Sequence, residues 1–308
     1  MTSQPAARHP AAPPTPTRIG PAPFEWGTRT YVMGILNATP DSFSGDGLLA
    51  LDDTSAVAVA RAMVEEGADI LDIGGESTRP GHATVSIEEE RARVVPVVAA
   101  VRAAFPALPI SIDTTKPAVA EAAIAAGADL LNDVWGTGTD DGMARVAAAH
   151  DVPLVVMHNR EEPRYAALIP EVLADLEAAI ERALHAGVGE SSIIVDPGFG
   201  FGKTPGQNVA LLRDLGALRG LGRPILLGTS RKSTLGRILD LPVDERLEAT
   251  LATTALAIAA GVDMIRVHDV RANVRAARVS DAIVRGGWRS DVPGPGVDPV
   301  DAVKGGTR

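Results

Sequence analysis

The sequence predicts a single-domain α/β protein with the (β/α)₈ barrel fold. Short apolar runs, partly β-branched, alternate with Ala-rich helical stretches, which is typical of parallel strands joined by crossover helices. Eight such units are present in the 308 residues, and a barrel of this kind occupies roughly 250 residues as one domain. A doubly wound open sheet is the alternative. The predicted strands are 31–36, 70–73, 110–113, 130–133, 153–157, 193–196, 225–228 and 264–268.

Composition limits the possible partners and location. The formal net charge is -10, which argues against a general affinity for nucleic acid or anionic membranes but permits a local cationic pocket. There is no cysteine, so disulfides and thiolate metal sites are excluded. The sequence has neither a run of about 18 apolar residues nor the apolar segment of a signal peptide. A cytoplasmic protein is expected.

Both ends of the chain are predicted to be mobile tails. Residues 1–23 and 289–308 are rich in Pro, Ala and Gly and have few large apolar side chains, too few to offset the entropy lost on ordering. The barrel domain is therefore expected to span residues 24–288.

Polar residues stand at the carboxyl ends of the predicted strands. In a (β/α)₈ barrel these ends form one rim, where functional residues gather. Polar residues after strands are common in α/β proteins, so their joint occurrence is more informative than any one of them. The strand-end residues are Asn37, Glu76, Asp113, Asn132, His158, Asp196, Ser230 and His268.

The loop after the first strand contains two candidate metal ligands. Asn37 and Asp41 offer hard oxygen atoms, which suit Mg²⁺, and Mg²⁺ commonly takes only one or two protein ligands together with substrate phosphate oxygens. A phosphorylated substrate would then bind here. Equally, these side chains could bond to the local backbone in a turn.

The loop 74–81 places hydroxyl groups and the Arg79 guanidinium between flanking glycines, an arrangement suited to an anionic ligand. Arg79 could instead form a surface ion pair.

Asp113, Asn132 and Asp196 end three different strands and would face one cavity. A carboxylate accepts two parallel hydrogen bonds, and an amide supplies both a donor and an acceptor. The set therefore suits the edge of a flat heterocycle such as a pterin or guanine. The alternative for the segment 196–198 is a turn, and Asp133 could be the structural member of the Asn132-Asp133 pair.

Aromatic residues gather in candidate site loops although only 3% of the chain is aromatic. Phe43, Phe199 and Phe201 are three of the five phenylalanines, and the last two lie in a loop with four glycines. An aromatic co-substrate is one explanation, and a hydrophobic latch over the barrel mouth is the other.

Cationic residues lie after the seventh predicted strand and on the eighth. Lys232 and Ser233 open a predicted helix, whose free backbone N–H groups favour anions. Arg266 and His268 alternate on the eighth strand, so both face the same side, where a phosphate would be a natural partner. His158 could equally be structural.

Taken together, these segments make the chain resemble the dihydropteroate synthases, folate-pathway enzymes of the pterin-binding (β/α)₈ family. The resemblance spans roughly residues 31–286 and includes seven blocks in the family's order. The blocks are GILNATPDSFS, DILDIGGESTRPG, ISIDT, LLNDV, DPGFGFGKT, TSRKS and IRVHDV.

The resemblance implies a condensation of 6-hydroxymethyl-7,8-dihydropterin diphosphate with p-aminobenzoate, and a homodimer. Asn37 would bind Mg²⁺ on the diphosphate. Lys232, Arg266 and His268 would be the catalytic residues, with Arg266 also lying against the pterin ring. The pterin diphosphate would contact Thr78, Asp113, Asn132, Asp196, Lys232, Arg266 and His268. The p-aminobenzoate side would contain Phe43, Arg79, Pro80, Phe201 and Ser233.

Some positions depart from the family pattern. Asp46 is displaced by one position in the first loop, and Trp135 stands where a small residue is common. Three alternative functions remain: a non-catalytic pterin-binding homologue, a corrinoid methyltransferase of the same fold, and a sugar-phosphate barrel enzyme. The methyltransferase would not need the 229–233 anion site or the Phe-rich loops. A silent homologue would not need Asn37, Lys232, Arg266 and His268 together. A sugar-phosphate enzyme would leave the strand-end carboxylates unexplained.

Overall fold

The computed structural model describes residues 12–38, 53–76, 85–136, 140–286 and 288. Its main sheet contains eight parallel strands in the order β8-β7-β6-β5-β4-β3-β10-β9. A single parallel bridge from Val195 to Ile225 joins the two outer strands, so the sheet closes. The strands are β3 (Tyr31–Asn37), β4 (Ile70–Gly74), β5 (Ile110–Asp113), β6 (Leu130–Asp133), β7 (Leu154–Met157), β8 (Ile193–Asp196), β9 (Leu226–Leu227) and β10 (Met264–Val267).

Every strand of this eight-stranded sheet begins and ends within one residue of the predicted range. The (β/α)₈ barrel predicted from the sequence is thus confirmed, and the open sheet is not what forms. The strand segments are almost wholly buried because a parallel sheet inside a ring of helices is covered on both faces.

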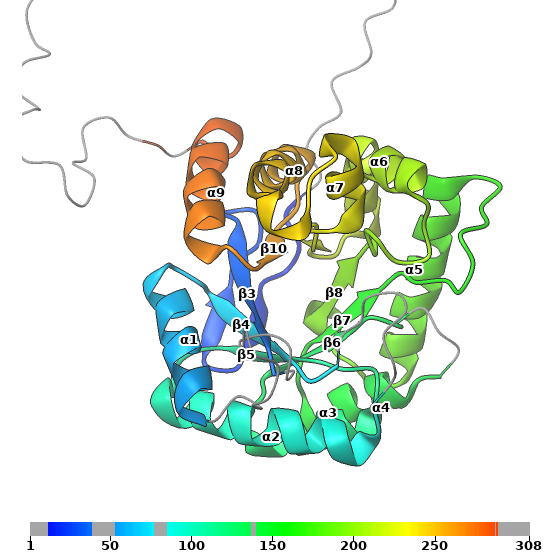
Figure 1. Cartoon of the computed structure of the whole chain (residues 1–308). Coiled ribbons are helices and arrows are strands. Elements are labelled where there is room, and N and C mark those ends of the chain that lie inside the picture. Colours follow the sequence, from blue (N-terminus) through cyan, green and yellow to red (C-terminus); the bar gives the residue numbers. More distant parts are fainter. Residues whose placement is uncertain (1–11, 39–52, 77–84, 137–139, 287, 289–308) are drawn as a thin grey trace, which may run out of the picture.

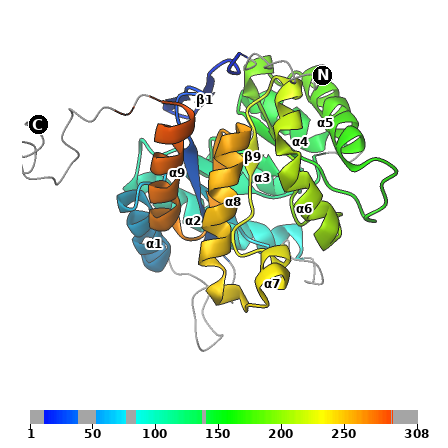
Figure 2. The same cartoon turned by 90° about the horizontal axis from the view of Figure 1, so that it is seen from above.

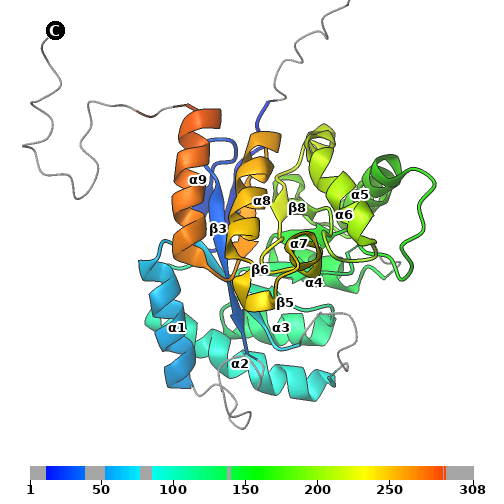
Figure 3. The ribbon, with the colours of Figure 1, turned by 45° about the horizontal axis from the view of Figure 1, so that its top comes forward.

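Helices surround the strands on all sides (Figure 1). α8 and α9 lie side by side on one flank of the barrel (Figures 2 and 3). No helix in the described ranges is both long and apolar enough to cross a membrane. The helices are α1 (Asp53–Glu65), α2 (Ile87–Ala104), α3 (Pro117–Ala126), α4 (Gly142–His150), α5 (Leu168–His185), α6 (Pro205–Arg213), α7 (Ser233–Leu239), α8 (Leu247–Ala260) and α9 (Val270–Val284), with 3₁₀ turns η1 (Glu190–Ser192), η2 (Leu215–Leu221) and η3 (Val243–Glu245).

A β-hairpin closes the amino-terminal end of the barrel. β1 (Thr17–Ile19) pairs antiparallel with β2 (Ala22–Phe24), and β1 lies at the end of the molecule opposite α7 (Figure 2). Ile19 is fully buried, and the Phe24 and Tyr31 rings have centroids 4.4 Å apart. The hairpin therefore covers the opening at the amino-terminal end of the barrel.

The prediction that residues 1–23 form a mobile tail is wrong for the part that forms this hairpin. The folded domain includes Thr17 and does not begin at residue 24. The hairpin is ordered because the open end of the barrel supplies the apolar surface that its own short segment lacks. Residues 1–11 and the predicted carboxyl-terminal tail, 289–308, lie outside the described residues.

Candidate functional site

The strand register places the predicted site residues at one end of the barrel. Asn37 pairs with Gly74, Gly74 with Asp113, and Asp113 with Asn132 across four neighbouring strands. Farther round the sheet, Asp196 pairs with Met157. Because all eight strands are parallel, these residues stand on the carboxyl rim, as the sequence predicted.

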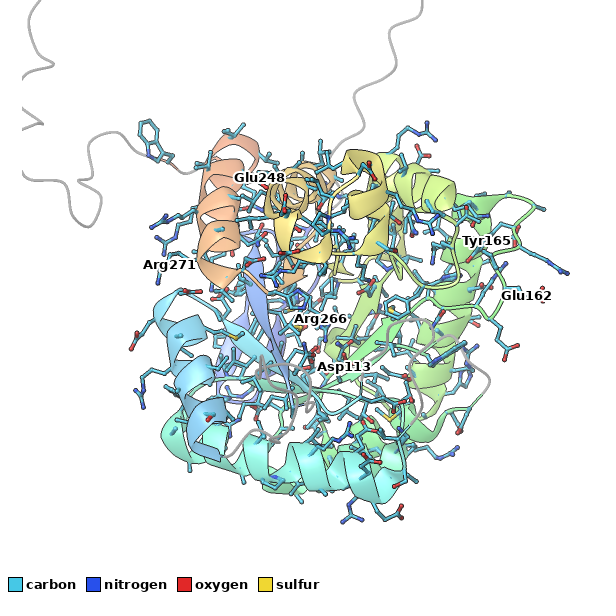
Figure 4. The ribbon with its side chains drawn as sticks, viewed as in Figure 1. Asp113, Glu162, Tyr165, Glu248, Arg266 and Arg271 are labelled. Carbon is cyan, nitrogen blue, oxygen red and sulfur yellow. The ribbon has the colours of Figure 1, made fainter. Side chains whose placement is uncertain are left out.

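An ionic cluster fills the barrel just below this rim. Arg266 on β10 donates from Nε to Asp72 Oδ2 at 2.5 Å and from Nη2 to Asp113 Oδ2 at 2.6 Å. Arg266 and Asp113 lie close together inside the ring of helices (Figure 4). One guanidinium is therefore shared by two carboxylates from β4 and β5, strands that lie far from β10 in the sequence.

Asp72 was not among the residues singled out from the sequence. It is fully buried, accepts from Ser111 Oγ at 2.6 Å and accepts from Asn132 Nδ2 at 3.1 Å, in addition to its bond with Arg266. The signal that could have revealed it is an acidic residue in the middle of an apolar strand, since a buried charge requires partners.

Asp113 retains an unused acceptor. Its Oδ1 is buried and has no hydrogen-bond partner among the described residues. Burial raises the pKa of the Asp113 carboxyl to about 7, Arg266 opposes this shift, and Asp72 adds to it. A buried acceptor of this kind is costly unless a ligand pairs with it. The free oxygen thus suits an N–H or O–H group of a bound molecule.

Asp196 and Lys232 are two further charged residues near the rim, and they interact electrostatically with each other. Asp196 Oδ1 accepts from Gly198 N at 2.7 Å, and the Lys232 ammonium bonds to the Phe199 carbonyl. Burial lowers the pKa of Lys232 to about 8, although Asp196 opposes this, and burial also raises the pKa of Asp196. Lys232 also interacts electrostatically with Arg266 and Asp113, so it lies near the ionic cluster of Arg266, Asp72 and Asp113.

The Phe-rich loop lies against this lysine. The Lys232 ammonium stands 4.4 Å from the centre of the Phe201 ring. Phe199 is fully buried and thus packs into the protein, whereas Phe201 remains partly exposed. Of these two rings, Phe201 is the one with exposed surface to offer a ligand.

His268 and Ser233 lie on the last two strand-to-helix connections. His268 Nδ1 is 3.0 Å from Ser230 Oγ. Ser233 is exposed and is the first residue of α7. Arg231 forms a bidentate ion pair with Asp269 at 2.6 and 3.0 Å, whereas Lys232 interacts with Asp196, Arg266 and Asp113.

His158 and Asp133 are in structural positions. His158 is fully buried, with Nδ1 2.9 Å from Lys203 Nζ and Nε2 3.1 Å from Asp175 Oδ2. Asp133 Oδ1 accepts from Trp135 N at 2.9 Å, as expected for the structural member of its pair. The Trp135 side chain itself is 42% exposed.

Part of the predicted site lies outside the described residues: Asp41, Phe43, Asp46, Thr78, Arg79 and Pro80. Within the described ranges, no group of three or more His, Cys, Asp or Glu residues could hold a metal ion. Asn37 is partly exposed at the rim. A single hard oxygen atom at this position fits an ion such as Mg²⁺, which takes most of its ligands from water and substrate.

A free carboxylate oxygen, an amide and a half-buried lysine thus lie where the strands end. This is the arrangement that a flat ring with N–H and carbonyl groups on its edge requires. The molecule is a (β/α)₈ barrel protein whose carboxyl rim carries groups suited to a flat heterocycle.

Comparisons with known proteins identify the family. Residues 33–268 match the family described as pterin binding enzyme. The dihydropteroate synthase of Clostridium beijerinckii is 52% identical over 269 residues, which cover 87% of this chain and 99% of that protein. The chain belongs to the dihydropteroate synthases of the pterin-binding enzyme family.

Solved structures agree. A dihydropteroate synthase from Clostridium difficile, crystallised in the presence of pteroic acid, superposes with a TM-score of 0.81 at 48% identity, covering 85% of this chain and 99% of that chain. The Xanthomonas albilineans enzyme in complex with 7,8-dihydropteroate gives a TM-score of 0.76 at 42% identity, covering 83% and 94%.

Proposed function

We propose that this protein condenses 6-hydroxymethyl-7,8-dihydropterin diphosphate with p-aminobenzoate to give 7,8-dihydropteroate and diphosphate. The observation that carries the proposal is the Asp113-Arg266-Asp72 cluster at the barrel mouth, with its one free carboxylate oxygen. The dihydropteroate synthases of similar sequence and structure support it independently. A silent homologue or a pterin-dependent methyltransferase would use the same cluster to bind a pterin, so the 52% identity with a dihydropteroate synthase is what favours the synthase over both.

The pterin is proposed to bind by its edge. Asp196 would accept from N3 and the 2-amino group, while Lys232 would donate to O4 and N5. The Asn132 side chain is held by its hydrogen bond to Asp72, and Asp113 Oδ1 offers the pterin a further acceptor. Arg266 would lie against the ring. The proposal gives N3, the 2-amino group, O4 and N5 each a charged partner, which is how a protein distinguishes one heterocycle from another.

The diphosphate is proposed to leave from the side of Arg266, His268 and Asn37. Mg²⁺ bound through Asn37 would add positive charge to the diphosphate oxygens. Thr78 would line the adjoining pterin pocket. Removing Mg²⁺ with a chelator, then restoring it, is expected to abolish and recover turnover.

The p-aminobenzoate is proposed to stack near Phe201, whose ring already faces Lys232, and to reach Ser233 at the start of α7. Phe43, Arg79 and Pro80 would complete this side. Closure of the first two loops would exclude water, which would otherwise compete for the activated pterin.

The displacement is proposed to be dissociative. The bond from the exocyclic methylene carbon to the diphosphate oxygen breaks, and its electron pair leaves with diphosphate. The electron-rich dihydropterin delocalises the resulting cation. The neutral amine then forms the new C–N bond and releases a proton. A rate that ignored pterin electronics but rose steeply with amine basicity would contradict this order and favour a concerted displacement.

A homodimer is also proposed, through the flank formed by α8 and α9. Large apolar side chains are exposed there: Leu256 is 64% exposed, Val279 63% and Ile283 77%. Apolar side chains gathered on one surface often mark an interface. Light scattering should give the mass of two chains for the wild type and of one chain for Ile283→Asp. A wild-type monomer would contradict the proposal.

The deciding experiment incubates the purified protein with the dihydropterin diphosphate, p-aminobenzoate and Mg²⁺. Dihydropteroate and diphosphate are expected in equal amounts. Binding of the pterin without product would instead indicate a silent homologue.

The cytoplasmic location expected from the sequence stays a prediction, which cell fractionation would test.

A further inference from the structure

We propose that Asp72 is a positioning residue of the pterin site: it holds Arg266 and Asn132 in place and keeps Asp113 Oδ1 free for the ligand. This inference rests on the proposed function, because it assumes that the mouth of the barrel binds a pterin. Asp72 is fully buried, so it acts through its neighbours and does not itself touch the substrate.

The contacts of Asp72 are all with side chains that face the barrel interior. Oδ2 accepts from Arg266 Nε at 2.5 Å and from Asn132 Nδ2 at 3.1 Å, and Oδ1 accepts from Ser111 Oγ at 2.6 Å. Two of these partners belong to the proposed pterin pocket. One carboxylate thus fixes the orientation of both an amide and a guanidinium at the site.

A second buried aspartate shows what a purely structural role looks like. Asp263 is 4% exposed and accepts from backbone N–H groups, Gly27 N at 3.2 Å and Ile225 N at 3.1 Å. It lies immediately before β10, at the amino-terminal end of the barrel, and ties the chain together there. Asp72, in contrast, orients side chains.

Sharing the guanidinium has a geometric consequence. Asp72 takes Arg266 Nε, which leaves Nη2 for a single oxygen of Asp113. Arg and carboxylate groups prefer to pair through two parallel hydrogen bonds. Without Asp72, Arg266 can turn to bond both oxygens of Asp113. The acceptor that the ligand would use is then occupied.

The test compares Asp72→Asn with Asp263→Asn, using calorimetric binding of the dihydropterin diphosphate. In Asp72→Asn the dissociation constant is expected to rise about 10-fold to 100-fold, since a charge-assisted hydrogen bond is lost. Asp263→Asn is expected to lower the melting temperature and to leave the affinity within about twofold.

The pH dependence gives a readout that a merely structural role would not move. Removing the Asp72 charge removes one cause that raises the pKa of Asp113, so Asp113 stays ionised to lower pH. The acid limb of pterin affinity should therefore shift to lower pH in Asp72→Asn. The charged groups that face Asp113 are Arg266, Asp72, Glu90, Asp133 and Lys232.

Ser111→Ala is the second variant, for use if Asp72→Asn does not fold. It removes one hydrogen bond to Asp72, so the dissociation constant of the pterin should rise about threefold. Unchanged affinity and an unchanged pH profile in a folded Asp72→Asn, or unchanged affinity in Ser111→Ala if only that variant folds, would overturn the inference. A wild type that binds no pterin would instead overturn the proposed function.

Discussion

The two ends of the barrel are built from opposite kinds of side chain. At the amino-terminal end, Ile19, Phe24 and Trp26 pack against a layer of apolar strand residues, including Met33 and Leu130. At the carboxyl end the interior holds two ion-paired carboxylates, a guanidinium and a lysine. Both layers are largely withdrawn from water, but the carboxyl-end layer contains a buried acceptor, Asp113 Oδ1, that has no partner among the described residues.

This difference separates stability from ligand binding. Burying apolar surface stabilises the fold in proportion to the area removed from water. Burying charges usually costs stability, and replacing them with apolar groups is often neutral or favourable. We call the apolar layer at the amino-terminal end the lower layer and the charged layer at the carboxyl end the upper layer. We infer that the lower layer stabilises the barrel and that the upper layer serves to bind the ligand. Substitutions in the two layers should therefore have opposite signatures.

The largest expected effect is on the upper layer. Asp196→Ala should abolish measurable pterin binding, a loss of about 4 kcal/mol or nearly a thousandfold, because a buried charged contact disappears. Its melting temperature should stay near that of the wild type. Calorimetry and circular dichroism check both. Unchanged affinity would remove the pterin assignment of Asp196.

The converse substitution, Phe24→Ala, changes the lower layer. Truncating this buried aromatic should lower the free energy of unfolding by about 3 kcal/mol or more, because a cavity replaces the ring. The kcat/KM of the remaining folded protein should be unchanged. Urea unfolding and steady-state kinetics measure the two quantities. A large rise in the KM for the pterin would show that the two ends are not independent.

An intermediate effect is expected where the upper layer depends on its supports. Lys203 Nζ bonds to the carbonyl oxygens of Gly198 and Phe201 at 3.0 and 3.1 Å and to His158. Lys203→Met should lower kcat/KM for p-aminobenzoate about tenfold, because the loop that carries Phe201 loses its anchor. Arg164, whose side chain is 84% exposed nearby, provides the control Arg164→Met. Equal activity in both variants would refute this role.

The smallest expected effect is on the pH profile. Burial lowers the pKa of Lys232 to about 8, so the ammonium that would donate to the pterin is lost as pH rises through that value. The kcat/KM for the dihydropterin diphosphate should thus fall above about pH 8. Initial rates between about pH 6 and about pH 10 test this. A flat profile would mean that the neutral amine suffices.

The strands and rim residues were predictable because they depend on local patterns. Each apolar run followed by polar residues marks a strand and its end, and all eight predicted strands match the structure within one residue. Once the strands are parallel, their carboxyl ends must share a rim, which brings Asp113, Asn132 and Asp196 to one side. The hairpin at residues 17–24 was missed, because the apolar surface that orders it comes from distant strands.

The sequence by itself thus determined the barrel, its repeat and the rim on which a ligand would bind. Only the tertiary structure decided how the charges are shared. Asp72 meets Ser111, Asn132 and Arg266, which are 39, 60 and 194 residues away. Strand formation follows from the burial of neighbouring residues, whereas hydrogen-bond partners inside the barrel are chosen when the sheet closes.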